Sequence, residues 1–168
     1  HAPPVQANLI NYLWPLGIVV MAPLFLPGVS LTRRHLLAAL LGFAGAALAI
    51  LGRGGSAEVV WAWGYVPAAA SAFIWASYSL LTKRVQPFPT AAIGSFALAS
   101  GLLSLACHWW LEPAAVLSTH DILLIAVLGL GPLGGAFFLW DAAIKRGDAR
   151  QIGVLSFLTP LLSTLTLL

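Results

Sequence analysis

An internal repeat limits how this chain can fold more than any other feature. Residues 6–16, QANLINYLWPL, return as residues 151–161, QIGVLSFLTPL, at a constant offset of 145 residues. The first, eighth, tenth and eleventh positions (Gln, Leu, Pro and Leu) are identical in the two copies. Each copy lies in an apolar run long enough to cross a bilayer as a helix, which needs about 20 residues.

Six apolar runs of this kind follow one another along the chain, at roughly 5–27, 36–52, 60–82, 90–111, 121–144 and 150–168. The copies lie in the first and the sixth run, five crossings apart, so they pass the membrane in opposite directions. Many secondary transporters are built from inverted repeats, with the substrate site near the midplane between them. The pattern therefore predicts an all-α, polytopic membrane helix bundle and makes transport the leading hypothesis.

The composition supports a membrane protein. Hydrophobic residues make up 60% of the chain and charged residues 8%, against about 45–50% and about 25% in soluble domains. If the repeat unit is five helices, residues 1–52 hold the last two helices of a first repeat, 53–59 a periplasmic linker, and 60–168 the first four helices of a second. We then expect ten transmembrane helices in the full protein, with about six in this fragment.

Basic residues are distributed unevenly between alternate loops. Seven of the eight fall on one side, namely Arg33, Arg34, Lys83, Arg84, Lys145, Arg146 and Arg150, and only Arg53 falls on the other. The positive-inside rule places the side rich in Lys and Arg in the cytoplasm. We therefore expect loops 28–35, 83–89 and 145–150 inside, and 52–59 and 112–120 outside.

The fourth run ends in a group that suits the outer membrane interface. His108, Trp109, Trp110 and Glu112 close this run, and amphipathic aromatic residues gather at the headgroup level. We interpret them as anchors in preference to ligand contacts.

Pro15 and Pro160 lie near the middle of their spans. A proline inside a helix has no N–H for the carbonyl of residue i−4, which is Asn11 in one copy and Ser156 in the other. Asn8, Asn11 and Pro15 share a helix face with Tyr12 beside them. Two interpretations stay open: these polar groups line a cavity, or they bond neighbouring helices for about 0.6 kcal/mol each.

Aromatic side chains on two other runs suggest cavity walls. Trp75 and Tyr78 share one face of the third run, and a polar-tipped aromatic residue deep in a span usually has a partner. Phe137 and Trp140 lie one turn apart in the fifth run, after the segment GLGPLGG at 129–135. For those glycines we favour tight helix packing over flexibility.

Asp141 is the one intramembrane acid that needs an explanation. Lys145 follows four residues later, and an i, i+4 ion pair explains the acid better than a proton relay does. Neither phosphate-binding glycine loops nor metal-ligand spacings occur in the sequence, and no nucleophile and base stand at a common depth. We therefore expect no enzyme activity, no cofactor and no nucleic-acid partner.

Three segments together resemble a known family. The segment PPVQANLINYLWPL with LTRRHLLAALLGFAGAALAILG resembles the end of an EamA repeat of the drug/metabolite transporter superfamily. The segment WAWGYVPAAASAFIWASYSLLTKR resembles the first helix of a second EamA repeat, and LWDAAIKRGDARQIGVLSFLTPLLSTL its third and fourth helices. Within the superfamily, N-N-Y-x-W-P and the tryptophan-rich third run are similar to the YddG-type aromatic amino-acid exporters of bacterial inner membranes. Many EamA repeats carry an acid soon after the proline helix, but APLFLPGVSLTRR has none.

The resemblance implies two inverted five-helix repeats and export of amino acids, aromatic ones in the YddG pattern, by alternating access through a central cavity. It implies a monomer in the bacterial inner membrane with a small-molecule substrate. The implied substrate-binding residues are Asn8, Asn11, Tyr12, Trp14, Pro15, Trp75, Tyr78, Phe137, Trp140, Ser156 and Pro160. Asn11, Ser156 and freed carbonyls would hold the ammonium and carboxylate, and the aromatic residues would enclose the side chain.

Other functions remain open from sequence alone. A carrier of nucleotide sugars or other phosphate-bearing metabolites would call for Lys or Arg inside the cavity, and no midplane position has one. A carrier of cationic drugs is a further alternative, as is a membrane scaffold that transports nothing. The scaffold hypothesis leaves the repeated Asn/Ser and Pro pairs unexplained.

Overall fold

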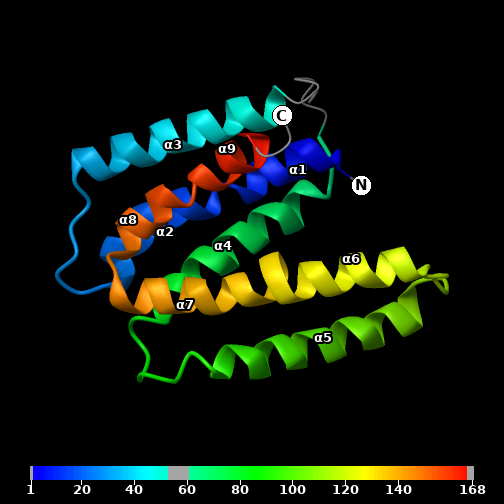
Figure 1. Cartoon of the computed structure of the whole chain (residues 1–168). Helices are drawn as coiled ribbons and strands as arrows, with labels where there is room; N and C mark the ends of the chain where they lie inside the picture. Colours follow the sequence, from blue (N-terminus) through cyan, green and yellow to red (C-terminus); the bar gives the residue numbers. More distant parts are fainter. Residues whose placement is uncertain (1, 53–60, 166–168) are drawn as a thin grey trace. The chain divides into compact units, whose positions relative to one another are not determined.

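The computed structural model describes residues 2–52 and 61–165, and every regular element in these ranges is helical (Figure 1). The elements are α1 (Pro4–Asn11), α2 (Trp14–Phe25), α3 (Arg33–Leu51), α4 (Tyr65–Leu81), α5 (Ala92–Leu111), α6 (Thr119–Leu130), the π-helix η1 (Gly131–Gly135), α7 (Ala136–Arg146), α8 (Ala149–Leu155) and α9 (Leu158–Leu165). The all-α prediction is confirmed. The predicted linker 53–59 lies outside the described residues.

Within the described residues, four helical segments are long and apolar enough to cross a membrane. They are Pro4–Phe25, Arg33–Leu51, Ala92–Leu111 and Thr119–Arg146. The predicted third span, 60–82, is shorter than expected, because α4 begins only at Tyr65 and has 17 residues. The predicted sixth span is divided between α8 and α9.

The chain forms two compact units. Unit 1 comprises residues up to Val85 together with those from Gly147 onward, and unit 2 is Gln86–Arg146. Unit 1 thus contains α1 to α4, α8 and α9, which come from both predicted repeats, and unit 2 contains α5 to α7.

Small residues hold unit 1 together. Helix α2 packs against α4 and α8, and its Ile18, Val19 and Ala22 are fully buried. A Cβ on Gly17 would stand 3.1 Å from the Cβ of Ala76 on α4. Such close helix approach suits membranes, where association depends on packing because lipid is as apolar as the helix surface.

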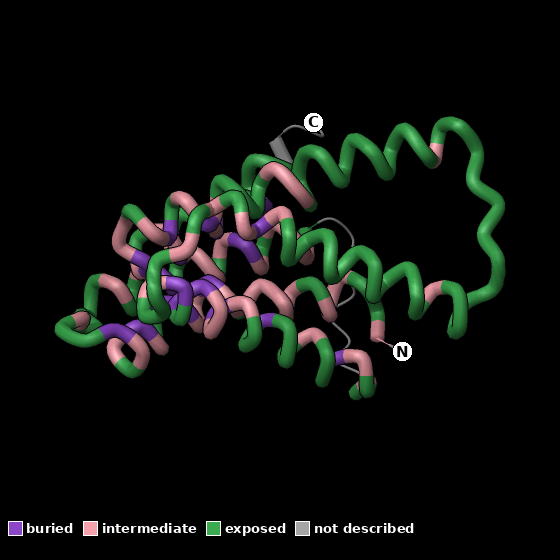
Figure 2. Tube along the Cα trace, turned by 90° about the horizontal axis from the view of Figure 1, so that it is seen from below, coloured by how far each residue is buried: buried purple, intermediate pink, exposed green. Residues whose placement is uncertain are grey.

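In unit 2, almost every residue of α5 and α6 is exposed (Figure 2), and most of these residues are apolar. Ser118 and Asp121 form a capping box that begins α6, because the Ser118 hydroxyl accepts from the Asp121 N–H and the Asp121 carboxylate accepts from the Ser118 N–H at 2.9 Å. Trp109 and Trp110 near the end of α5 are 87% and 84% exposed. Their role as interface anchors stays a prediction.

Candidate functional site

Both copies of the repeat are broken helices. The first breaks at Tyr12 and Leu13, between α1 and α2, and the second at Ser156 and Phe157, between α8 and α9. At these breaks the Leu13 N–H donates to the Ile10 carbonyl at 3.1 Å, and the Phe157 N–H donates to the Val154 carbonyl at 3.2 Å, three residues back instead of four. The two sequences therefore produce the same interruption at nearly equivalent positions.

The prolines stand just after these breaks. Pro15 is the second residue of α2 and Pro160 the third of α9, and the first turn of a helix tolerates proline because its N–H groups have no partner inside the helix. The prolines thus begin new helical segments, which is why the spans break cleanly and do not merely kink.

The two broken helices run in opposite directions, as the repeat predicts (Figure 1). They meet where α2 packs on α8. A Cβ on Gly153 would be 3.1 Å from the Pro15 carbonyl oxygen and 3.3 Å from Cγ2 of Ile18. Glycine at position 153 is therefore what allows α8 to approach the backbone of α2 beside its break.

Asn11 bonds a neighbouring helix. Its side-chain amide donates to the Ser71 hydroxyl on α4 at 2.5 Å, and the Ser71 hydroxyl donates to the Ala68 carbonyl at 3.2 Å. Earlier on the same two helices, the Tyr65 hydroxyl donates to the Gln6 side-chain oxygen. Sequence reasoning missed the partners of this interface, although Gln6 is one of the four identities of the repeat.

For Ser156, the prediction of a freed carbonyl is wrong. The Ser156 carbonyl accepts from the Thr159 N–H at 3.1 Å, and its hydroxyl donates to the Gly153 carbonyl at 2.6 Å. The Thr159 N–H, three residues after Ser156, thus takes the place of the donor that Pro160 lacks. In the other copy Asn8 is exposed and Tyr12 is half-buried.

Three aromatic side chains, Trp14, Trp75 and Tyr78, form a cluster in unit 1 that we call the aromatic triad. The rings of Trp14 and Trp75 meet edge to face, with centroids 6.3 Å apart and planes at 87°. Trp75 and Tyr78 lie 5.4 Å apart with planes at 32°. All three side chains are half-buried, so the cluster keeps open surface.

The aromatic triad lies beside the Asn11/Ser71 bond. Trp14 follows Asn11 by three residues and Trp75 follows Ser71 by four. The Trp14/Trp75 contact therefore lies about one helical turn from the Asn11/Ser71 contact. The junction of α1 and α2 and the middle of α4 therefore present a polar contact and an aromatic contact in succession. We call these four residues with Tyr78 the polar–aromatic ladder.

Phe137 and Trp140 lie one turn apart on α7, Phe137 exposed and Trp140 half-buried. They belong to unit 2, whereas the aromatic triad belongs to unit 1. Their membership in one site with the aromatic triad stays a prediction.

The glycine-rich segment before α7 forms the π-helix η1. A Cβ on Gly134 would stand 1.9 Å from the Gly129 carbonyl oxygen, and one on Gly135 would stand 2.7 Å from the Leu130 carbonyl oxygen. An added Cβ on Gly129 or Gly131 would meet no atom of the described residues within 4 Å. Among the described residues, the close contacts of these glycines are with the segment's own backbone, and the preference for tight helix packing stays a prediction.

Asp141 forms the predicted pair with Lys145, with 2.6 Å between the ammonium and the carboxylate. The acid is only 2% exposed, and its Oδ2 also accepts from the Thr90 hydroxyl at 2.7 Å. Lys145 donates further to the Phe88 carbonyl at 2.8 Å and lies 3.7 Å from the centre of the Phe88 ring. The pair fixes the segment before α5 onto α7, which is a structural role.

Comparison with known proteins adds an independent line of evidence. Residues 62–167 match the model of the EamA-like transporter family. The aromatic amino acid exporter YddG of Ancylobacter novellus is 43% identical over 99% of this chain and 58% of its own length. The protein of the same name from Escherichia coli K12 is 28% identical over 98% of this chain and 58% of its own.

A solved crystal structure superposes with a TM-score of 0.88 at 44% identity, over 99% of this chain and 57% of the other. The chain therefore spans rather more than half the length of the relatives it matches. With its apolar helices, it is a multi-pass protein of the bacterial inner membrane. The broken-helix repeat and the family match agree, and the chain belongs to the EamA-like transporter family.

Proposed function

We propose that the full-length protein exports amino acids with aromatic side chains, by alternating access through a central cavity that the two repeats enclose. The names of the relatives from A. novellus and E. coli, aromatic amino acid exporter, support the substrate class. The opposed broken helices of unit 1 support the mechanism, because inverted repeats with discontinuous helices are a common basis of alternating access.

The polar–aromatic ladder carries the proposal. An aromatic amino acid has its ammonium and carboxylate at one end and its ring at the other, separated by a distance comparable to one helical turn of about 5.4 Å. The ladder offers an amide and a hydroxyl, Asn11 and Ser71, about one turn from the aromatic triad. In this proposal the substrate's ammonium and carboxylate replace part of the Asn11/Ser71 contact, and its ring packs on Trp75.

Transport by the full-length protein in proteoliposomes tests the function. Vesicles loaded with unlabelled amino acid should accumulate the labelled form by counterflow, for Trp, Phe and Tyr more than for Ala or Ser. A protein that exchanges none of the panel, or that exchanges small and aromatic amino acids equally, contradicts the proposed substrate class.

Two substitutions locate the site. Trp75→Ala should weaken the binding of aromatic substrates more than that of small ones. Asn11→Ala should impair all amino acids alike, by about 1.5–3 kcal/mol for a lost hydrogen bond to a charged group, or roughly ten- to a hundredfold in affinity. Phe73→Ala is the matched control, because Phe73 is an exposed aromatic residue of the same helix. Equal effects of Trp75→Ala and Phe73→Ala would place Trp75 outside the site.

A further inference from the structure

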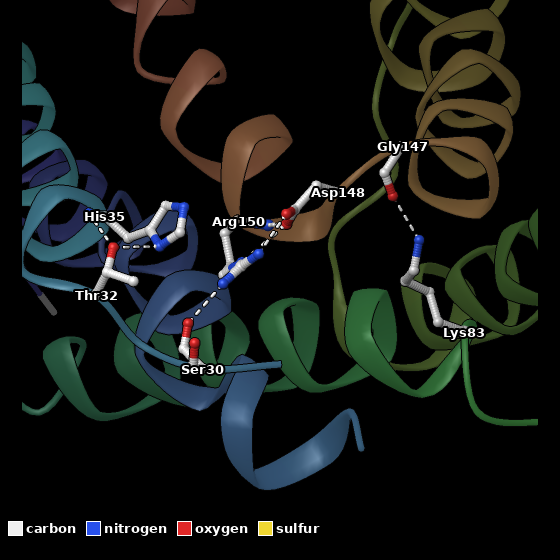
Figure 3. A network of polar contacts seen from close by, with 7 residues as sticks. All are labelled: Ser30, Thr32, His35, Lys83, Gly147, Asp148 and Arg150. Carbon is white, nitrogen blue, oxygen red and sulfur yellow. Dashed lines mark hydrogen bonds and ion pairs between the residues drawn. The ribbon is translucent and has the colours of Figure 1, made fainter. Parts of the chain in front are cut away.

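A polar network joins three segments of unit 1 at the end that carries the basic loops (Figure 3). Arg150 near the start of α8 donates through Nε and Nη2 to the two carboxylate oxygens of Asp148, at 3.0 and 2.6 Å. Its remaining arm, Nη1, donates to the Ser30 carbonyl oxygen at 2.5 Å. Ser30 lies in the segment between α2 and α3, so the guanidinium bonds a residue 120 positions away in the chain.

Asp148 holds this guanidinium in place. It is the N-cap of α8, where its Oδ1 accepts from the Arg150 N–H at 2.8 Å, and the forked pair fixes the plane of the arginine side chain. The hydrogen bonds from Arg150 lower the pKa of Asp148 to about 2. The carboxylate is thus ionised throughout the physiological range, and the third arm of Arg150 is directed at the α2–α3 segment.

A second contact ties the start of α8 to α4. The Lys83 ammonium, just beyond the end of α4, donates to the Gly147 carbonyl oxygen at 2.5 Å. The acceptor is again a backbone oxygen. The ends of α2, α4 and α8 are therefore joined at one level of unit 1 by two cationic side chains (Figure 3).

We propose that Asp148, Arg150 and the Ser30 carbonyl form a clasp that holds the α2–α3 segment of the first repeat against α8 of the second and opens whenever the transporter opens to the cytoplasm. This inference rests on the proposed function, since only alternating access requires the two repeats to separate at this end. The structure of the clasp allows it to open. It uses one hydrogen bond between the repeats, and the Arg150 and Asp148 side chains are 16% and 31% exposed, so water can replace the bond.

Distances between spin labels in the full-length protein test the clasp. Labels on Leu31→Cys and Gln151→Cys, in a background without other cysteines and in lipid nanodiscs, report the separation of the two segments directly. Arg150→Met keeps the length of the side chain but removes its charge and its donors. It should raise the ratio of separated to joined populations by about three- to tenfold, the effect of losing one partly exposed charge-assisted hydrogen bond.

Three further variants isolate the cause. Asp148→Asn keeps a good N-cap for α8 but removes the forked ion pair, and should shift the distances in the same direction as Arg150→Met. Arg150→Lys keeps the charge without the fork and should fall between the wild type and Arg150→Met. Arg146→Met removes an exposed charge outside the clasp and should leave the distances unchanged.

Distances and transport separate the two proposals. Distances that stay unchanged in Arg150→Met and Asp148→Asn, or that shift as much in Arg146→Met, overturn the clasp even where labelled amino acids are transported. Distances that shift as expected in a protein that exchanges no amino acid support the clasp as a conformational device and contradict the proposed substrate.

Discussion

Gly134→Ala should remove the π-turn of η1. The added Cβ would stand 1.9 Å from the Gly129 carbonyl oxygen, whereas real Cβ contacts essentially never fall under 3.0 Å. The oxygen would have to move by about 1.1 Å, and the obstacle is backbone, which cannot rotate away as a side chain can. Overpacking of this kind costs about 1–3 kcal/mol, and we expect the upper end of that range.

The free energy of unfolding of the full-length protein, measured by titration with SDS in mixed micelles, should fall by about 3 kcal/mol in Gly134→Ala. Gly129→Ala is the matched control, because an added Cβ there meets nothing within 4 Å. Alanine is the better helix former by about 0.8–1.0 kcal/mol, so that control should be neutral or slightly stabilised.

Deleting Leu133 in the Gly134→Ala protein gives a sharper test. A π-turn holds one more residue than an α-turn, so the deletion should allow a continuous α-helix and restore stability. If the helical segments on either side of η1 keep their places, the π-turn determines the direction in which the side chains of Phe137 and Trp140 point. Stability equal to wild type in Gly134→Ala without the deletion would refute this reasoning.

Three further predictions concern other parts of the chain. Gly153→Ala, whose Cβ would stand 3.1 Å from a backbone oxygen of α2, should lower the free energy of unfolding by about 1–2 kcal/mol in the same titration, whereas Gly45→Ala, with open space, should not lower it. The pKa of Asp148, about 2 in the fold against 3.8 otherwise, means that its stabilising effect is complete above pH 4 and is lost as the pH falls through 2. The distance between the spin labels at 31 and 151 should therefore stay constant from pH 8 to pH 5, and a lengthening in that window would contradict the assignment. In intact cells an impermeant thiol reagent should label a cysteine that replaces Thr119 but not one that replaces Arg84, and the opposite pattern would overturn the topology.

The broken helices could be predicted in place but not in detail. Proline removes a donor at a known position, so the interruption near residues 11 and 156 followed from local chemistry. The fate of each carbonyl did not, because the Ser156 oxygen finds a new partner in Thr159. Whether a break leaves an open acceptor depends on the backbone path, and proline alone does not fix that path.

Contacts between residues far apart in the chain could not be predicted from the sequence, for a different reason. Trp75 was expected to have a partner, but many residues could have met it, and only packing selects Trp14. Arg150 Nη1 donates to the backbone carbonyl of Ser30. Since every residue carries a backbone carbonyl, no type of side chain marks this acceptor in the sequence. The π-turn in the segment GLGPLGG was not predicted, because glycines serve equally in helix contacts and in a π-turn.

The bonds between α1 and α4 have a consequence for biosynthesis. Asn11 and Gln6 find their partners, Ser71 and Tyr65, about 60 residues further along the chain. At about 5–20 residues per second, a ribosome needs roughly 3 to 12 seconds to add that length. During this interval Ser71 and Tyr65 have not yet been added to the chain, so we expect α1 to take up its final packing only after α4 has emerged.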